Sequence, residues 1–319
     1  MAVWKLACAM YNESAAACAV MLFALLPYFF GAGFVITPDS ALLAFWAWSI
    51  WFLYLAFFQQ SASAWRGLAL CLGLGMLSKY TIVLLGPSIL LFMLIDREAR
   101  RWFSRKEPYF CAICALVLFL PVIYWNMVNQ WASFAFQGAQ RVKETPRFYL
   151  FEFLWHVLAI LTPAGLIVFL RLLGRTKPAT AAPREPDRKR TFTLCLILPA
   201  LLLFMFFSLR HQVKINWSGP LFLALLPILA ASLRQINQYA RRSKIEILWS
   251  ATFPLLFIAY WATLHFLAFG LPFVPYTEKM YKALAWGDLA KEVKKIEARL
   301  SQTGAAPVTV VGMDKHYIA

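Results

Sequence analysis

Long apolar runs alternate with short polar segments along this chain. The runs cover residues 14–35, 41–58, 67–95, 109–127, 149–170, 191–209, 218–233 and 245–268. Runs of this length are long enough to cross the ~30 Å hydrocarbon core of a bilayer. Because lipid offers no hydrogen-bonding partner to an exposed backbone, the spans must be helices. The pattern predicts an all-α polytopic membrane protein.

The composition agrees with this fold class. Of the 319 residues, 61% are hydrophobic, 17% aromatic and only 14% charged, whereas about 25% of a typical soluble domain is charged. The cysteines lie in or near the apolar runs, without the spacing of a disulfide framework or a metal site. The sequence therefore supports no cofactor and no divalent metal. The cysteines are Cys8, Cys18, Cys71, Cys111, Cys114 and Cys195.

Basic residues gather between the apolar runs in clusters at 97–106, 171–190 and 234–244. By the positive-inside rule these loops lie in the cytoplasm. The formal net charge of +16 is then explained by topology and by contact with anionic membrane lipids. Nucleic acid is a poor explanation, so we expect no nucleic-acid partner.

The run from Leu68 to Ile95 is too long for one comfortable span and short for two. Its only charge, Lys79, lies near the middle. A single span would place Lys79 at the bilayer centre, at about 3 kcal/mol on insertion scales, whereas a hairpin would place it at the far surface. The hairpin also leaves Lys5 and Arg66 on the side of the basic clusters. We therefore predict about nine transmembrane helices, with the N-terminus cytoplasmic and the C-terminus outside.

This topology places one carboxylate and several cations on the outer face. A lipid-linked phosphate substrate needs this combination, because cations pair with phosphate and a carboxylate orients a sugar or a nucleophile. The predicted catalytic residue is Asp39, and the predicted substrate-binding residues are Lys79, Arg141, Arg210, His211 and Lys214.

Structural roles are open for the same residues. Asp39, which follows Pro38, is also a good helix N-cap, and Lys79 is placed to snorkel from a helix end. The residues from Arg210 to Lys214 also suit an ordinary solvated loop. Glu152 and His156, at i and i+4 within one run, fit a satisfied interior pair better than a catalytic one.

Three ordered segments carry a family resemblance. They are "GFVITPDSALLAFWAWSIWFLYLAF", "WRGLALCLGLGMLSKYTIVLLGPSILLFML" and, after a basic loop, "LPVIYWNMVNQWASFAFQGAQR". Over residues 5–235 the chain resembles the bacterial branch of the protein O-mannosyltransferase-like glycosyltransferases. This is glycosyltransferase family 39 in the broad sense, within the GT-C superfamily and related to the lipid A aminoarabinose transferases.

The resemblance implies a GT-C type core in the bacterial cytoplasmic (inner) membrane. Such enzymes take a sugar from a polyprenyl-phosphate donor and attach it, outside that membrane, to lipopolysaccharide, lipid A or another envelope glycan. Asp39 matches the acidic residue of the family's active-site face, and Lys79 matches a lysine that neutralises the donor phosphate. The loop with Arg210, His211 and Lys214 matches a region that contacts the donor head group. The implied mechanism is direct displacement at the anomeric carbon, with a carboxylate as base.

Both ends of the sequence depart from the family pattern. Family members begin with one more hairpin, whose outer loop carries another acidic residue. After the core, residues 276–300 predict an amphipathic helix and residues 306–314 a strand. We expect a transmembrane core over 1–268 and, over 269–319, the beginning of a truncated α/β periplasmic domain, so the chain reads as cut at both ends.

Three functions are compatible with these features. The first is a membrane glycosyltransferase, whose partners are a lipid-linked sugar donor, an envelope glycan or lipid acceptor and the membrane lipids. The second is a transporter or flippase for lipid-linked sugars, which predicts internal repeats that the sequence does not show. The third is a catalytically inactive fragment that only binds lipid phosphate.

Overall fold

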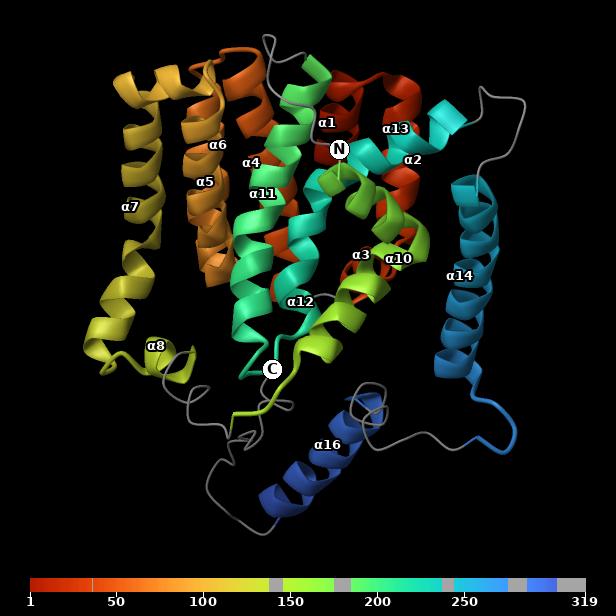
Figure 1. The fold of residues 1–319 in the computed structure, drawn as a ribbon. Coiled ribbons are helices and arrows are strands. Elements are labelled where there is room, and N and C mark those ends of the chain that lie inside the picture. The colour runs from red at the N-terminus through yellow and green to blue at the C-terminus, as the bar shows by residue number, and fades with distance from the viewer. Residues whose placement is uncertain (36, 138–145, 175–184, 237–243, 275–285, 303–319) are drawn as a thin grey trace. The chain divides into compact units, whose positions relative to one another are not determined.

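The computed structural model describes residues 1–35, 37–137, 146–174, 185–236, 244–274 and 286–302, and nearly all of them are helical (Figure 1). The only β-structure in these ranges is one isolated bridge between Leu271 and Val274. The 3-10 helices are η1 (Tyr80–Leu84), η2 (Ala99–Ser104) and η3 (Gly219–Leu225). The α-helices are α1 (Ala2–Met10), α2 (Glu13–Leu25), α3 (Pro27–Phe34), α4 (Pro38–Phe58), α5 (Ala64–Ser78), α6 (Leu85–Ile95), α7 (Glu107–Val128), α8 (Ala132–Gln137), α10 (Leu150–Gly174), α11 (Glu185–Phe207), α12 (Ile215–Ser218), α13 (Leu226–Ile236), α14 (Lys244–Phe269) and α16 (Trp286–Gln302).

The predicted fold class is confirmed, and the predicted number of spans stays a prediction. Within the described residues, six helices are long and apolar enough to cross a membrane, or seven if α2 and α3, which meet at a 69° bend, form one broken span. The two further spans of the predicted nine are Ala64–Ser78 and Tyr80–Ile95, which are both shorter than 18 residues. At 1.5 Å per residue, neither crosses ~30 Å unaided.

These two short segments form the predicted hairpin. The helix α5 ends at Ser78, and Lys79 has extended backbone angles (φ −160°, ψ 132°). The ring of Phe57, in the last turn of α4, contacts Trp65 at the start of α5 and Phe92 near the end of α6, with ring centroids 5.8 and 5.0 Å apart. The start of α5 and the end of α6 therefore lie at one level, and the chain turns back at Lys79.

Close approach of α5 to its neighbour α7 depends on a small residue. A Cβ atom added to Gly73 would lie 2.5 Å from the Leu118 side chain of α7. Small residues at helix contacts bring backbones together and increase dispersion contacts, which drive association where lipid removes the hydrophobic effect between helices. This packing helps to position the hairpin that ends at Lys79.

At the C-terminal end of α4, three consecutive basic residues of α11 hold the ends of α4 and of two other helices. Arg188 Nη2 donates to the carbonyl oxygen of Phe57 at 2.8 Å, Lys189 Nζ to that of Met10 at 2.6 Å, and Arg190 Nε to that of Leu172 at 2.7 Å. The last carbonyls of a helix have no partner within it, and they carry the negative end of its dipole. These cations therefore join the ends of α4, α1 and α10 at one end of the bundle.

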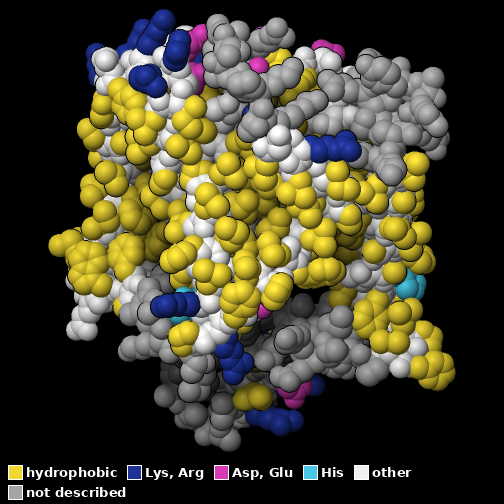
Figure 2. Space-filling view, viewed as in Figure 1, with side chains coloured by type: hydrophobic (Ala, Val, Ile, Leu, Met, Phe, Trp, Pro, Cys, Tyr) yellow, Lys and Arg dark blue, Asp and Glu magenta, His cyan; other side chains and the backbone are white. Residues whose placement is uncertain are grey.

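The surface is that of a multi-pass membrane protein. Hydrophobic side chains cover much of the described surface on the face drawn in Figure 2, and Lys and Arg side chains gather at its upper left corner, with others in the lower part of the view. On α7, large apolar side chains such as Ile113, Leu116 and Leu120 are more than half exposed. Such a continuous apolar face suits contact with lipid. The predicted orientation of the chain in the membrane stays a prediction.

The chain divides into two compact units, Met1–Leu256 and Phe257–Ala319, so the division falls within α14. In the second unit the predicted amphipathic helix is present from Trp286 to Gln302. The predicted strand at 306–314 lies outside the described residues. The division into a core at 1–268 and a periplasmic domain at 269–319 stays a prediction.

Candidate functional site

Asp39 lies in the first turn of α4, and its carboxylate points away from the backbone of that helix. Thr37 is the N-cap residue, and its amide donates to Ser40 Oγ at 3.4 Å. Ser40 Oγ in turn contacts the carbonyl oxygen of Ala32 at 2.7 Å. Asp39 is therefore not the N-cap residue, and neighbouring side chains organise the helix start, which leaves its two carboxylate oxygens for other partners.

Those partners come from segments that are far apart in the sequence. Lys79 Nζ donates to Asp39 Oδ1 at 2.5 Å, and Asn216 Nδ2 donates to Asp39 Oδ2 at 2.8 Å. Asp39 exposes 15% and Lys79 22% of the side chain. A partly buried ion pair with an additional amide donor holds the carboxylate in a fixed orientation. We call Asp39, Lys79 and Asn216 the Asp39 cluster.

Each member of the cluster lies at or next to the end of a helix. Lys79 lies in the turn between α5 and η1, where Ser78 Oγ donates to the carbonyl oxygen of Pro38 at 2.6 Å. Asn216 lies in α12, the short helix that precedes η3. Lys79 Nζ also contacts the Asn216 carbonyl oxygen at 3.5 Å. The turn at Lys79 and the short helix α12 thus meet the start of α4 at one end of the bundle.

Two residues of the cluster region were not predicted from the sequence. Asn216 carries no charge, although an amide directly after a basic loop and before an apolar run is a signal for a buried polar contact. Tyr28 of α3 lies within electrostatic reach of Asp39. Its ring packs against Gly219, where an added Cβ atom would lie 2.2 Å from Tyr28 Cε1. Tyr28 Oη is buried without a hydrogen-bond partner in the described part of the chain.

The other predicted site residues lie on the segment that leads to Asn216. Arg210 and Lys214 are exposed, and neither forms an ion pair with another described residue. The His211 ring packs on Phe207 with centroids 4.8 Å apart, and its Nδ1 is buried without a partner among the described residues. Within the described structure, no hydrogen bond or ion pair joins these three side chains to Asp39. The predicted Arg141 lies outside the described residues.

A second polar group holds this same segment against α10. His156 Nδ1 lies 3.1 Å from the Val213 carbonyl oxygen, and Gln212 Nε2 donates to Glu152 Oε1 at 2.7 Å. His156 Nε2 and Glu152 Oε1 are 3.9 Å apart. The predicted interior pair is therefore also a clamp, which fixes the backbone that precedes Asn216.

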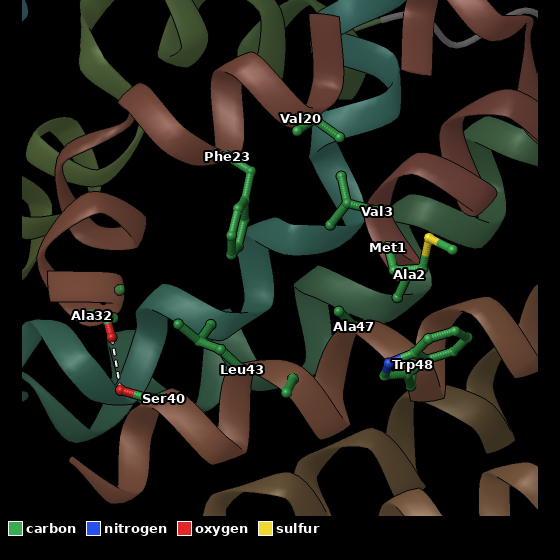
Figure 3. Close-up of a pocket in the computed structure, with 12 residues that line it drawn as sticks. Met1, Ala2, Val3, Val20, Phe23, Ala32, Ser40, Leu43, Ala47 and Trp48 are labelled. Atoms are coloured by element: carbon green, nitrogen blue, oxygen red, sulfur yellow. Dashed lines mark hydrogen bonds between the residues drawn. The ribbon is translucent and has the colours of Figure 1, made fainter. Parts of the chain in front are cut away.

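An apolar cavity of about 290 Å³ lies on another side of α4, between α4 and the first three helices. In Figure 3, Phe23, Val3 and Leu43 point into this space, and Ser40 closes one end through its hydrogen bond to Ala32. Its lining contains no charged side chain. The cavity is suited to an apolar group.

No group of three or more His, Cys, Asp or Glu side chains that could hold a metal ion occurs within the described residues. The charged residues of the Asp39 cluster are Asp39 and Lys79, and Asn216 is a neutral donor. Chemically, this arrangement offers a carboxylate that accepts hydrogen bonds and an ammonium group that donates them.

Residues 1–125 match the family model described as "Dolichyl-phosphate-mannose-protein mannosyltransferase". The match includes Asp39 and Lys79 and ends well before Asn216. It supports the glycosyltransferase resemblance over this part of the 319-residue chain. No curated protein matches the chain, and no solved structure does.

Proposed function

We propose that this protein is a membrane glycosyltransferase that moves a sugar from a polyprenyl-phosphate donor to an envelope glycan, such as lipopolysaccharide or lipid A. The observation that carries the proposal is the Asp39 cluster, in which three distant segments place a carboxylate against an ammonium at one end of a membrane bundle. The match over residues 1–125 supports the same reaction class. The proposed location is the outer face of a bacterial inner membrane.

In the proposed reaction, the donor phosphate takes over Lys79 as its counter-ion. Phosphate competes well for an ammonium, because both ionic partners then form charge-assisted hydrogen bonds. Asp39, released from Lys79 and still held by Asn216, accepts the proton of the acceptor hydroxyl. The hydroxyl oxygen bonds to the anomeric carbon, the bond from that carbon to the phosphate oxygen breaks, and the electron pair leaves on the lipid phosphate. Arg210 and Lys214 add positive potential for the phosphate.

A second function is favoured by one feature of the cluster. Both carboxylate oxygens of Asp39 already have a donor, and a carboxylate with this role joins helices whether or not it takes part in chemistry. On this account the protein binds lipid phosphate through Lys79, Arg210 and Lys214 and transfers nothing. The two functions differ in what Asp39→Asn does.

The test is sugar transfer by the purified protein in proteoliposomes. The substrates are radiolabelled polyprenyl-phosphate hexoses as donors and lipopolysaccharide as acceptor, and binding of polyprenyl phosphate is measured in parallel. We expect Asp39→Asn to lower the transfer rate by about 10²- to 10⁴-fold, the usual contribution of a general base, with little loss of lipid binding. Glu13→Gln, the same carboxylate-to-amide change at the exposed start of α2, is the matched control.

Each outcome assigns one of the two functions. Transfer by the wild-type protein that persists within threefold in Asp39→Asn would contradict the role of Asp39. Lipid-phosphate binding that depends on Lys79, without transfer from any donor, would identify the non-catalytic binder. Lys79→Gln is expected to weaken donor binding under both functions.

A further inference from the structure

A second pocket lies at the same end of α7 as the short helix α8, and it adjoins the turn at Lys79. Figure 1 shows α8 beside the lower end of α7. Its volume is about 350 Å³, at the lower end of the ~300–1,000 Å³ that is usual for small-molecule sites. None of its lining residues is charged. We call it the Tyr80 pocket, and it is lined by Tyr80, Pro121, Val122, Trp125, Asn126 and Ser133.

The ring of Tyr80 is fixed by contacts on several sides. Its edge-to-face contact with Phe119 has a centroid distance of 5.5 Å, and Phe134 lies at 5.4 Å. The Tyr80 hydroxyl forms a hydrogen bond of 2.8 Å with Ser133 Oγ. Because the ring has little freedom left, the pocket has this wall in place before any ligand enters, which lowers the entropy lost on binding.

The backbone turn that precedes Ser133, one of the lining residues, is strained. Gln130 and Trp131 both have left-handed backbone angles, with φ of 52° and 58°, at a cost of about 1–2 kcal/mol for each residue. The buried Asn126 stabilises this turn: its carbonyl oxygen accepts from Trp131 N at 2.7 Å, and its Oδ1 accepts from Ser133 N at 3.1 Å. Strain of this kind persists where the surroundings fix a functional geometry, and here the turn places Ser133 beside Tyr80.

The Tyr80 pocket and the Asp39 cluster adjoin the same turn of the backbone. Successive side chains of an extended backbone point to opposite sides, and Lys79 has extended angles. Lys79 points to Asp39, and the next residue, Tyr80, points to α7 and α8. The pocket and the charged site therefore lie on opposite sides of this turn, and each is reached by one of two adjacent side chains.

The chemistry of the lining favours a sugar ring. One face of a pyranose presents C–H groups that pack on the negative face of an aromatic ring, and Trp125 is half exposed at the pocket. The hydrogen bond between the Tyr80 and Ser133 hydroxyls occupies one O–H donor and one acceptor lone pair. One O–H donor and several lone pairs therefore remain for sugar hydroxyls. An anion would find no cation among the lining residues, and a long acyl chain would leave the remaining hydroxyl donor without an acceptor.

We propose that the Tyr80 pocket is a saccharide subsite that holds one pyranose ring, from either the sugar donor or the acceptor glycan. Its role in transfer rests on the function proposed above, whereas binding of a sugar does not. The pocket thus adds a specificity-determining surface to a site that was identified only by its charges.

The binding test uses a panel of methyl pyranosides with glucose, galactose, mannose and 2-acetamido-glucose rings. The protein is held in nanodiscs free of sugar-based detergent, and saturation-transfer-difference NMR gives the dissociation constants. We expect at least one pyranoside to bind, Trp125→Ala to weaken its binding on the order of tenfold, and Tyr80→Phe to weaken it about fivefold. Matched controls are Trp155→Ala and Tyr124→Phe, because both residues are exposed and neither lines the pocket.

Stability is measured on the same samples, and Trp125→Phe, which keeps an aromatic face, is expected to retain most of the binding. No binding of any pyranoside by the folded protein, or equal losses in the pocket and control variants, would overturn the proposal. In the transfer assay, a higher KM for the donor in Tyr80→Phe assigns the subsite to the donor sugar, and a higher KM for the acceptor assigns it to the acceptor. If Asp39→Asn still binds the sugar but has lost transfer, both proposals are supported. If Asp39→Asn still transfers the sugar, only the role of Asp39 is overturned.

Discussion

Replacing Arg188 by methionine tests how the bundle is held together at the end opposite the Asp39 cluster. Arg188 exposes 11% of its side chain and Asp96 only 6%. The guanidinium contacts the carboxylate through Nε at 2.8 Å and Nη2 at 3.0 Å, and Nη2 also reaches the Phe57 carbonyl oxygen. Arg188→Met therefore leaves a buried carboxylate without its counter-ion.

The expected loss in the free energy of unfolding is about 3–5 kcal/mol, the range for removing one member of a buried ion pair. The contact of Arg188 with Glu98 adds little, because the Glu98 side chain is 58% exposed. Most of the loss comes from the uncompensated charge of Asp96. The double variant Arg188→Met with Asp96→Asn should therefore recover part of it, on the order of 1–2 kcal/mol, since an amide keeps the hydrogen bond from Ala99 N without the charge.

The assay is unfolding by SDS in mixed micelles, followed by tryptophan fluorescence. Arg97→Met is the matched control, since Arg97 is exposed on the neighbouring turn, and we expect it to change stability by less than ~0.5 kcal/mol. Equal midpoints for Arg188→Met and Arg97→Met, or a double variant less stable than Arg188→Met, would refute the reasoning.

Two further predictions concern the support of the Asp39 cluster. Gly219→Ala places a methyl group against the Tyr28 ring, so we expect the same SDS assay to show a loss of about 1–3 kcal/mol from overpacking; an unchanged midpoint would mean that the ring moves aside freely. His156→Ala removes the hydrogen bond to Val213 and is expected to lower sugar transfer about fivefold through the loosened segment, while His265→Ala, in α14, leaves transfer unchanged. Equal effects of the two histidine variants would count against the clamp.

The membrane class, the helical spans and the turn at Lys79 could be predicted because each depends on local properties. The length of an apolar run, compared with the fixed thickness of a bilayer, shows whether it can span. A lone lysine in such a run is costly unless it lies near the membrane surface. The count of nine stays a prediction, because the two arms of the hairpin, Ala64–Ser78 and Tyr80–Ile95, are each shorter than the other membrane-spanning helices.

Part of the candidate site was also predictable. A carboxylate and a lysine in separate segments on the same predicted face were named as site residues, and the structure brings Asp39 and Lys79 into contact. Their assignment to catalysis and phosphate binding stays a prediction. Asn216 was missed because an amide has no charge to draw attention to it, and its role depends on a partner 177 residues away.

The sequence by itself determined that this protein crosses a membrane as helices and that its few ionisable residues lie mostly between spans, because the transfer energy of each segment is additive and local. Only the tertiary structure decided which of those residues meet. Packing between helices turned Asp39 from a candidate N-cap into the partner of Lys79 and Asn216, and Arg188 from one of a basic cluster into a buried counter-ion. Hydrogen bonds and ion pairs act over ~3 Å, so they follow from how helices are packed, which hydropathy along the chain does not specify.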